Sequence, residues 1–200
     1  MLISKKFKLV YVHIPKCAGI GLRKKLTDLD PDCINFWSWE WDKKLSRYID
    51  KAHMALSDCL HYKDIRDALR DYFVFTIVRN PYERFFSATD EHIYQHDIPR
   101  NKYIYGEILE SLDPTKIRYN AKYVHFCPMH YFTHIGNKCI VDEIYYLDSL
   151  DYGLTRLCQI AEINPKLIFP FSVHNIKSGD HRENIYSLLR PDHINCLLYT

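Results

Sequence analysis

Three apolar, β-branched runs, each associated with a helical pattern, constrain the fold of this chain most strongly. They occupy residues 7–14, 72–78 and 139–147. Apolar runs of this length are typical of strands buried on both faces of a parallel sheet. Helical patterns begin at Leu22 and cover residues 81–96 and 149–163. This alternation predicts an α/β fold, a three-layer α/β/α arrangement with a central parallel sheet.

Weaker patterns fill the remaining chain. We expect a short strand at residues 34–36, a helix starting near Ser57 and another near residues 103–112. After Pro170 the sequence predicts a loop and two short helical segments divided by Pro191. No internal repeat or linker divides the 200 residues, so we expect a single domain spanning residues 1–200.

Composition excludes several classes of protein. The chain is 47% hydrophobic and 26% charged, with a formal net charge of +2, which excludes a disordered or polybasic chain. The sequence has no basic stripe of the kind that binds nucleic acid. No run reaches the roughly 18–20 apolar residues of a transmembrane helix. The seven cysteines are widely spaced without a CxxC pair, which predicts reduced thiols, no zinc site and a cytoplasmic location. The sequence does not specify an oligomeric state.

The first candidate site is the loop after the first apolar run. The chain has only six glycines, and two of them, Gly19 and Gly21, lie in this loop. A strand, a tight turn and a helix present backbone N–H groups and a helix N-terminus to an anion, and Lys16 adds a positive charge. The Walker pattern GxxxxGK[ST] is absent. The alternative is a structural turn with a solvated lysine. The candidate binding residues are Pro15, Lys16, Cys17, Ala18, Gly19, Ile20, Gly21 and Leu22.

The second candidate site follows the run at residues 72–78. That strand delivers Arg79 to the carboxyl edge of the sheet, where open parallel sheets bind ligands, and a guanidinium suits a phosphate. Asn80 as N-cap and Pro81 at the first helical position predict a helix start. Ser87, about two turns later, can point its hydroxyl back toward the same anion. Alternatives are a surface salt bridge for Arg79 and a structural role for Ser87.

Together, the segments HIPKCAG and VRNPYERFFSA resemble the sulfotransferases that use 3'-phosphoadenosine 5'-phosphosulfate (PAPS). The resemblance is to the carbohydrate-type branch, sulfotransferase family 2, and its small bacterial relatives. It implies a P-loop-like sulfotransferase fold and transfer of a sulfuryl group from PAPS to a hydroxyl acceptor, for which the family suggests a sugar or glycan. It places Lys16 on the 5'-phosphate and bridging oxygen, and Arg79 and Ser87 on the 3'-phosphate. The segment HNIKSGDHRENIYSLL resembles the family's late nucleotide-covering loop, which makes Lys177 a further candidate contact.

The first loop departs from the family pattern at two positions. The family usually has hydroxyl residues where this chain has Ile20 and Gly21. Backbone N–H groups and Lys16 are left to hold the phosphosulfate. This departure keeps a second hypothesis open, a non-catalytic PAPS-binding or PAP-binding relative, where PAP is the same nucleotide without the sulfuryl group. A small P-loop-like kinase is a third hypothesis, which the missing Walker pattern disfavours.

A histidine is the expected base, because the acceptor hydroxyl must lose its proton. By resemblance the segment KAHMALSD places His53 in this role, with Lys16 stabilising the leaving phosphate; the alternative for His53 is a structural histidine. The chemistry requires no metal, and the sequence cluster His125, His130 and His134 lacks an acid or cysteine at metal-ligand spacing.

Other residues have two open interpretations each. Trp37, Trp39 and Trp41 predict either packing at a sheet edge or a stacking wall for the acceptor. His174, Asn175 and Arg182, in the late loop, are candidates for contacts to the nucleotide or acceptor.

Overall fold

The computed structural model describes residues 1–113 and 115–171, and its centre is a five-stranded sheet in the order β3-β1-β2-β6-β9. β2 pairs with β6 and β6 with β9 in parallel, whereas β1 pairs antiparallel with both β2 and β3. Four of the five strands therefore run in one direction. Their bounds are β1 Leu2–Ser4, β2 Leu9–Val12, β3 Ile34–Asn35, β6 Phe73–Val78 and β9 Glu143–Tyr146.

The prediction of an α/β fold is confirmed, and the predicted central parallel sheet is mostly parallel, with β1 as its one antiparallel strand. The first eight residues contribute β1, which forms a hairpin with β2 through a turn in which Lys8 has a φ of 50°. The predicted strand at residues 7–14 is consequently shorter at both ends. Leu2 and Ile3 are fully buried in the sheet, although a three-residue strand shows too little pattern to be read from sequence.

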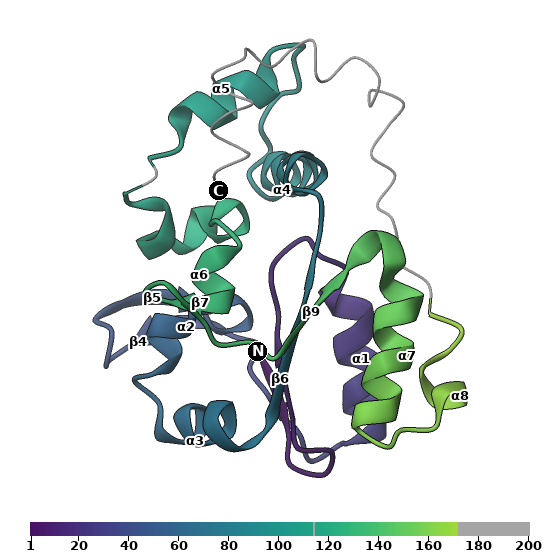
Figure 1. Cartoon of the computed structure of the whole chain (residues 1–200). Helices are drawn as coiled ribbons and strands as arrows, with labels where there is room; N and C mark the ends of the chain where they lie inside the picture. Colours follow the sequence, from purple (N-terminus) through teal and green to yellow (C-terminus); the bar gives the residue numbers. More distant parts are fainter. Residues whose placement is uncertain (114, 172–200) are drawn as a thin grey trace.

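Helices lie on both sides of the strands: α1 and α7 on one side and α3 on the other (Figure 1). α7 packs on β9, and α3 contacts β2. The α-helices are α1 Gly19–Leu29, α2 Leu56–Cys59, α3 Lys63–Asp71, α4 Pro81–Gln95, α5 Ile104–Ser111, α6 His130–Thr133, α7 Leu150–Ile160 and α8 Pro165–Ile168. Short 3₁₀ helices are η1 Lys51–His53, η2 Ile117–Tyr119, η3 Ala121–Phe126 and η4 Leu147–Ser149.

Two small hairpins accompany the central sheet. One pairs β4 (Trp39–Asp42) with β5 (Arg47–Asp50), and the other pairs β7 (His134–Ile135) with β8 (Lys138–Cys139). The apolar run at residues 139–147 is thus divided between the end of β8 and β9 rather than forming one strand. The β4–β5 hairpin lies beside α2 (Figure 1) and carries two of the three alternating tryptophans.

The local predictions around α4 are confirmed. The Asn80 side chain accepts hydrogen bonds from the backbone N–H groups of Tyr82 and Glu83, and Pro81 is the first helical residue. Gly153, in α7, has a packing role: a Cβ there would lie 2.7 Å from the Tyr145 ring. Because Gly153 has no Cβ, α7 can approach β9 closely. The glycine therefore supports the tertiary fold, although it lowers the helix propensity of α7.

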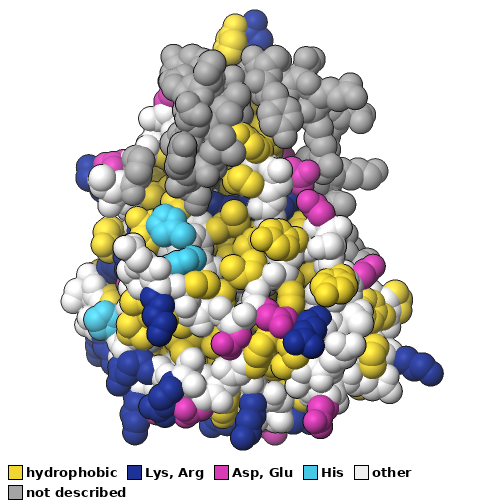
Figure 2. Space-filling model, in the orientation of Figure 1, with side chains coloured by type: hydrophobic (Ala, Val, Ile, Leu, Met, Phe, Trp, Pro, Cys, Tyr) yellow, Lys and Arg dark blue, Asp and Glu magenta, His cyan; other side chains and the backbone are white. Residues whose placement is uncertain are grey.

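The surface carries mixed charge. On the face in Figure 2, lysines and arginines gather along the lower edge, with acidic side chains among them and hydrophobic ones over the middle. Within residues 1–113 and 115–171, no helix is long and apolar enough to cross a membrane. The six cysteines in the same ranges are free thiols. The candidates Lys177, His174, Asn175 and Arg182, and the segments around Pro191, lie outside the described residues.

Candidate functional site

The loop between β2 and α1 is a tight turn whose geometry suits an anion. Lys16 and Ala18 both adopt left-handed conformations, with φ values of 66° and 61°. Ala18 is the N-cap of α1, makes no side-chain cap hydrogen bond, and no acidic residue follows in the first turn. The first-turn N–H groups and the positive end of the helix dipole are therefore available to a negatively charged ligand.

Gly19 has a different role from the one the sequence suggested. A Cβ on Gly19 would lie 1.9 Å from the His13 imidazole, so the glycine is required by close packing of that ring. Ile20, by contrast, is 71% exposed. Four loop residues are buried and offer a ligand at most their backbone, and one of them, Pro15, has no N–H to donate. They are Pro15, Cys17, Gly19 and Leu22.

The Cys17 thiol links the two candidate junctions. It is fully buried and lies close to the backbone of Arg79. Burial raises the pKa of this thiol to about 11. Cys17 is therefore protonated at neutral pH and serves to hold the loop against the end of β6, rather than as a nucleophile.

One face of α4 brings the predicted anion-binding residues together. Glu83, Ser87 and Glu91 are spaced four residues apart and share this face. The Arg79 Nε and Nη2 atoms lie 3.1 and 3.0 Å from the Glu83 carboxylate, and Lys16 Nζ lies 3.2 Å from that of Glu91. Ser87 is thus positioned between two cations that arrive from different strand ends.

The donor set fits a ligand with two anionic groups. Two mostly buried cations, Lys16 and Arg79, flank a serine, and an uncapped helix N-terminus lies next to one of them. Each cation has a carboxylate partner, Glu91 or Glu83, which an incoming phosphate would replace. The alternative of a salt bridge for Arg79 is therefore observed, and it is compatible with a binding role.

His53 lies directly beside this loop. Its Nδ1–H group donates a hydrogen bond to the His13 carbonyl oxygen over 3.0 Å. Because a carbonyl can only accept, Nδ1 carries the proton and Nε2 of the neutral ring has a free lone pair. The His53 ring centroid is 4.4 Å from that of His13 and 5.5 Å from that of His125, while Trp37 stacks on His13.

These three histidines are held neutral by burial. Desolvation lowers the pKa of His13 and His53 well below the usual 6.5. Burial also lowers the pKa of His125 to about 4, and the nearby Lys16 ammonium contributes to this shift. A neutral imidazole with an available Nε2 can accept a proton from a bound hydroxyl group.

Sequence reasoning missed the carboxylates and one histidine of this region. Glu83 and Glu91 could have been found from their four-residue spacing with Ser87. Asp50 lies at the end of β5, with Oδ2 4.0 Å from His53 Nε2. The structure places His125 with His53 and Asp50, whereas the sequence grouped it with His130 and His134. Only tertiary packing of η3 against the β4–β5 hairpin creates that proximity.

We expect the free energy of unfolding to decrease as the pH falls from 6.5 toward 4. Within the part of the chain that the structure describes, five histidines have a lowered pKa in the folded state. The unfolded chain therefore binds protons first, and the contribution of these histidines to stability is complete above 6.5 and lost on acidification. Each contributes a slope of up to about 1.4 kcal/mol per pH unit. They are His13, His53, His92, His125 and His130.

Urea unfolding at a series of pH values measures this dependence. His92→Gln, which removes one titrating group outside the candidate site, should reduce the slope. A constant free energy of unfolding across this range would contradict the predicted neutral state of the histidines.

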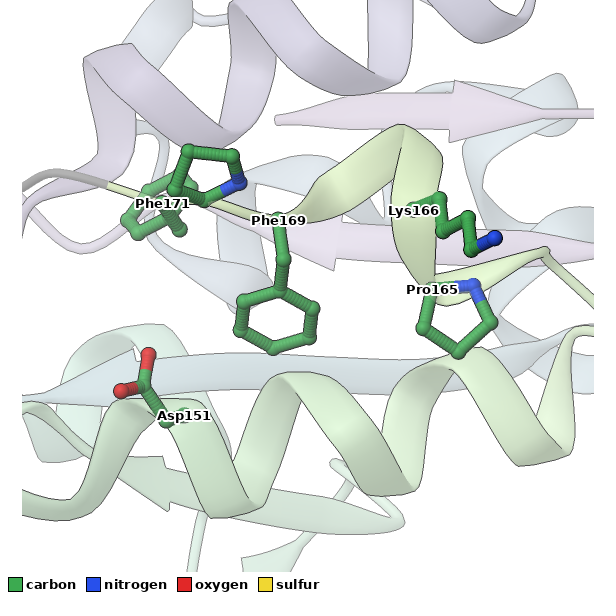
Figure 3. A pocket seen from close by; sticks show the side chains of 6 residues that line it. Asp151, Pro165, Lys166, Phe169 and Phe171 are labelled. Atoms are coloured by element: carbon green, nitrogen blue, oxygen red, sulfur yellow. The ribbon is translucent and has the colours of Figure 1, made fainter.

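One cavity lies away from the candidate site. It has a volume of about 580 Å³ and lies between α7 and α8, lined by Asp151, Pro165, Lys166, Phe169, Pro170 and Phe171 (Figure 3). It shares no lining residue with the two junctions and combines aromatic and proline surface with one acid and one lysine. Its lining has no converging set of cations and hydrogen-bond donors that could bind a phosphate, so it does not resemble an anion site.

Comparison with known protein families identifies the family of this chain. Residues 1–198 match the sequence model of sulfotransferase family 2, described as "Sulfotransferase family". Because the match covers nearly the whole chain, the protein is a transferase by class. It belongs to the sulfotransferase family, as the resemblance predicted. Searches of the curated proteins and of the solved structures gave no match.

Proposed function

We propose that the protein transfers a sulfuryl group from PAPS to a hydroxyl group of a carbohydrate acceptor. The observation that carries this proposal is the position of Lys16 and Arg79 on either side of Ser87. A nucleotide with phosphate groups at both ends of its ribose needs two such cations. We also propose the single domain, the P-loop-like three-layer architecture and the cytoplasmic location that the sequence predicts.

Each residue of the site has a role in an in-line displacement. Bound PAPS would supply the sulfuryl group and a phosphate leaving group. Lys16 and the first-turn N–H groups of α1 would bind that phosphate and stabilise its negative charge. Arg79 and Ser87 would hold the second phosphate and orient the nucleotide. His53 would accept the acceptor's hydroxyl proton at Nε2, while its hydrogen bond to His13 fixes the ring.

The β4–β5 hairpin supports a carbohydrate acceptor. Trp39 pairs with Asp50 and Trp41 with Tyr48, so these four side chains point to the same face of the hairpin. Both tryptophans and Tyr48 are more than half exposed. Because Asp50 neighbours His53, this aromatic face extends from the proposed base, and aromatic faces suit the stacking of sugar rings.

Transfer of ³⁵S from labelled PAPS to a panel of glycans tests the proposed function. Labelled product that requires both the protein and a hydroxyl acceptor would support it. Binding of PAP without transfer to any acceptor would instead support the non-catalytic relative, which Ile20 and Gly21 favour. Phosphoryl transfer from ATP would overturn both hypotheses.

We predict that His53→Gln lowers kcat by about 100-fold or more, the usual contribution of a general base. Glutamine keeps an N–H donor for the His13 carbonyl but cannot accept the hydroxyl proton. The dissociation constant for PAP should stay within about twofold, because the nucleotide contacts are elsewhere. His61→Gln, at an exposed histidine on the same segment, is the control. Full turnover by His53→Gln would exclude His53 as the base.

Trp39→Ala should raise the KM for a glycan acceptor by about 3- to 10-fold, the value of one aromatic contact. The KM for PAPS should not change, because Trp39 lies on the acceptor side. Initial rates with each substrate varied in turn measure the two constants. Tyr152→Ala, which removes an exposed aromatic side chain from α7, is the matched control. An equal change in both KM values would contradict the assignment.

A further inference from the structure

Three side chains near the first loop, one of them the proposed base His53, form a cluster of possible metal ligands. Asp50, His53 and His125 each offer one donor atom, and these atoms lie within 4.8 Å of one another. The residues come from three elements, β5, η1 and η3. Two imidazole nitrogens and one carboxylate oxygen match the donor set of zinc sites that keep a fourth position open.

Neighbouring groups already orient two of the three donors. The hydrogen bond from His53 Nδ1–H to the His13 carbonyl leaves Nε2 as the ligand atom, the arrangement usual for metal-binding histidines. Asp50 Oδ1 accepts the backbone N–H of Ala52 over 2.9 Å, whereas Oδ2 is the oxygen nearest to His53 Nε2, at 4.0 Å. His53 and Asp50 therefore each present one defined atom to the same space.

The surroundings have room for a small adjustment. A tetrahedral zinc ion with bonds of about 2.0–2.2 Å needs donors about 3.4 Å apart, so the donors must approach one another by about 1 Å. A cavity of about 20 Å³ adjoins Asp50 and His53 and gives them space to rotate. The nearest cations on its wall, Arg47 and Arg118, share Asp58 as their counter-ion.

We propose that Asp50, His53 and His125 bind one divalent transition-metal ion of the zinc type. The consequence rests on the proposed function: bound zinc occupies His53 Nε2 and so inhibits sulfuryl transfer. The ion is an inhibitor here and not a cofactor, because the metal ion and the proton of the acceptor hydroxyl compete for the same lone pair on His53 Nε2.

Calorimetric titration of the full chain with ZnCl₂, without nucleotide, tests the binding. One equivalent should bind with a dissociation constant on the order of 1 µM. His125→Gln and Asp50→Asn should each weaken it by about 100-fold. His96→Gln is the control, since His92 and His96 form another histidine pair, with ring centroids 4.5 Å apart. Equal affinity in all variants, or no binding by the wild type, would overturn the proposal.

The absorption spectrum of the cobalt(II)-loaded wild type tests the ligands without any substitution. Nitrogen and oxygen ligands should give visible bands without a thiolate charge-transfer band in the near ultraviolet. A thiolate band would place the ion on cysteine and overturn the proposal.

The inhibition has its own test. One equivalent of zinc should lower kcat without changing the affinity for PAP, and unchanged turnover of the zinc-loaded protein would overturn this consequence. A metal-free protein with no transferase activity would overturn the proposed function, while the calorimetric result would stand independently.

Discussion

Lys16→Ala should lower kcat/KM for PAPS by about 1000-fold, since removal of a group that stabilises developing charge commonly costs 100- to 1000-fold. Lys16 lies in the β2–α1 turn, two residues before the N-cap of α1, and its ammonium is 3.2 Å from the Glu91 carboxylate. Loss of the charge should reduce kcat in particular, because negative charge on the leaving phosphate increases in the transition state. Steady-state rates with varied PAPS measure both parameters.

Two variants distinguish this role from a structural one. Lys24→Ala removes an exposed lysine of α1 and should have no effect. Glu91→Gln removes the carboxylate partner of Lys16 and leaves the ammonium in place. If Lys16 served only to hold Glu91, Lys16→Ala and Glu91→Gln would cause the same loss of activity. That outcome would contradict the assignment of Lys16 to the phosphate.

Arg79→Ala should weaken the binding of PAP by about 100-fold, the cost of losing a charge-assisted bidentate contact. The binding of AMP, which lacks the 3'-phosphate, should change little, because Arg79 is assigned to that phosphate alone. Calorimetry with both nucleotides on wild type and variant gives the comparison. Glu83→Gln, which keeps the guanidinium but removes its partner, controls for loss of the salt bridge. Equal weakening of PAP and AMP would contradict the assignment.

The parts of the fold that were predictable have strong local signals. One continuous apolar run predicts β6, and the Asn80–Pro81 pair predicts the start of α4. Asn80 acts locally, because its side chain accepts a hydrogen bond from the nearby Tyr82 N–H group. β1 has only three residues, and its strand conformation depends on pairing with β2 and β3. A conformation that is stabilised by a distant segment leaves little trace in its own sequence.

The candidate site also combines residues that local motifs predict with residues that only tertiary packing brings together. Lys16, Arg79 and Ser87 lie in two motifs that could be recognised, and the structure brings these motifs together through α4. His125 joins His53 only because η3 packs against the β4–β5 hairpin. The carboxylate partners of the two cations share a four-residue spacing with Ser87 and could have been found from it. Sequence reasoning therefore provided the candidate anion-binding residues but not the groups that balance their charge.

The central claim is that Lys16 and Arg79 form a site for a nucleotide with phosphates at both ends of its ribose. The melting temperature of the wild-type chain, measured with PAP, AMP or ATP at equal concentrations, tests this claim most directly. A ligand at 100 times its dissociation constant stabilises the folded state by about 2.7 kcal/mol. PAP should raise the melting temperature clearly more than AMP or ATP. Stabilisation by ATP without stabilisation by PAP would contradict the account.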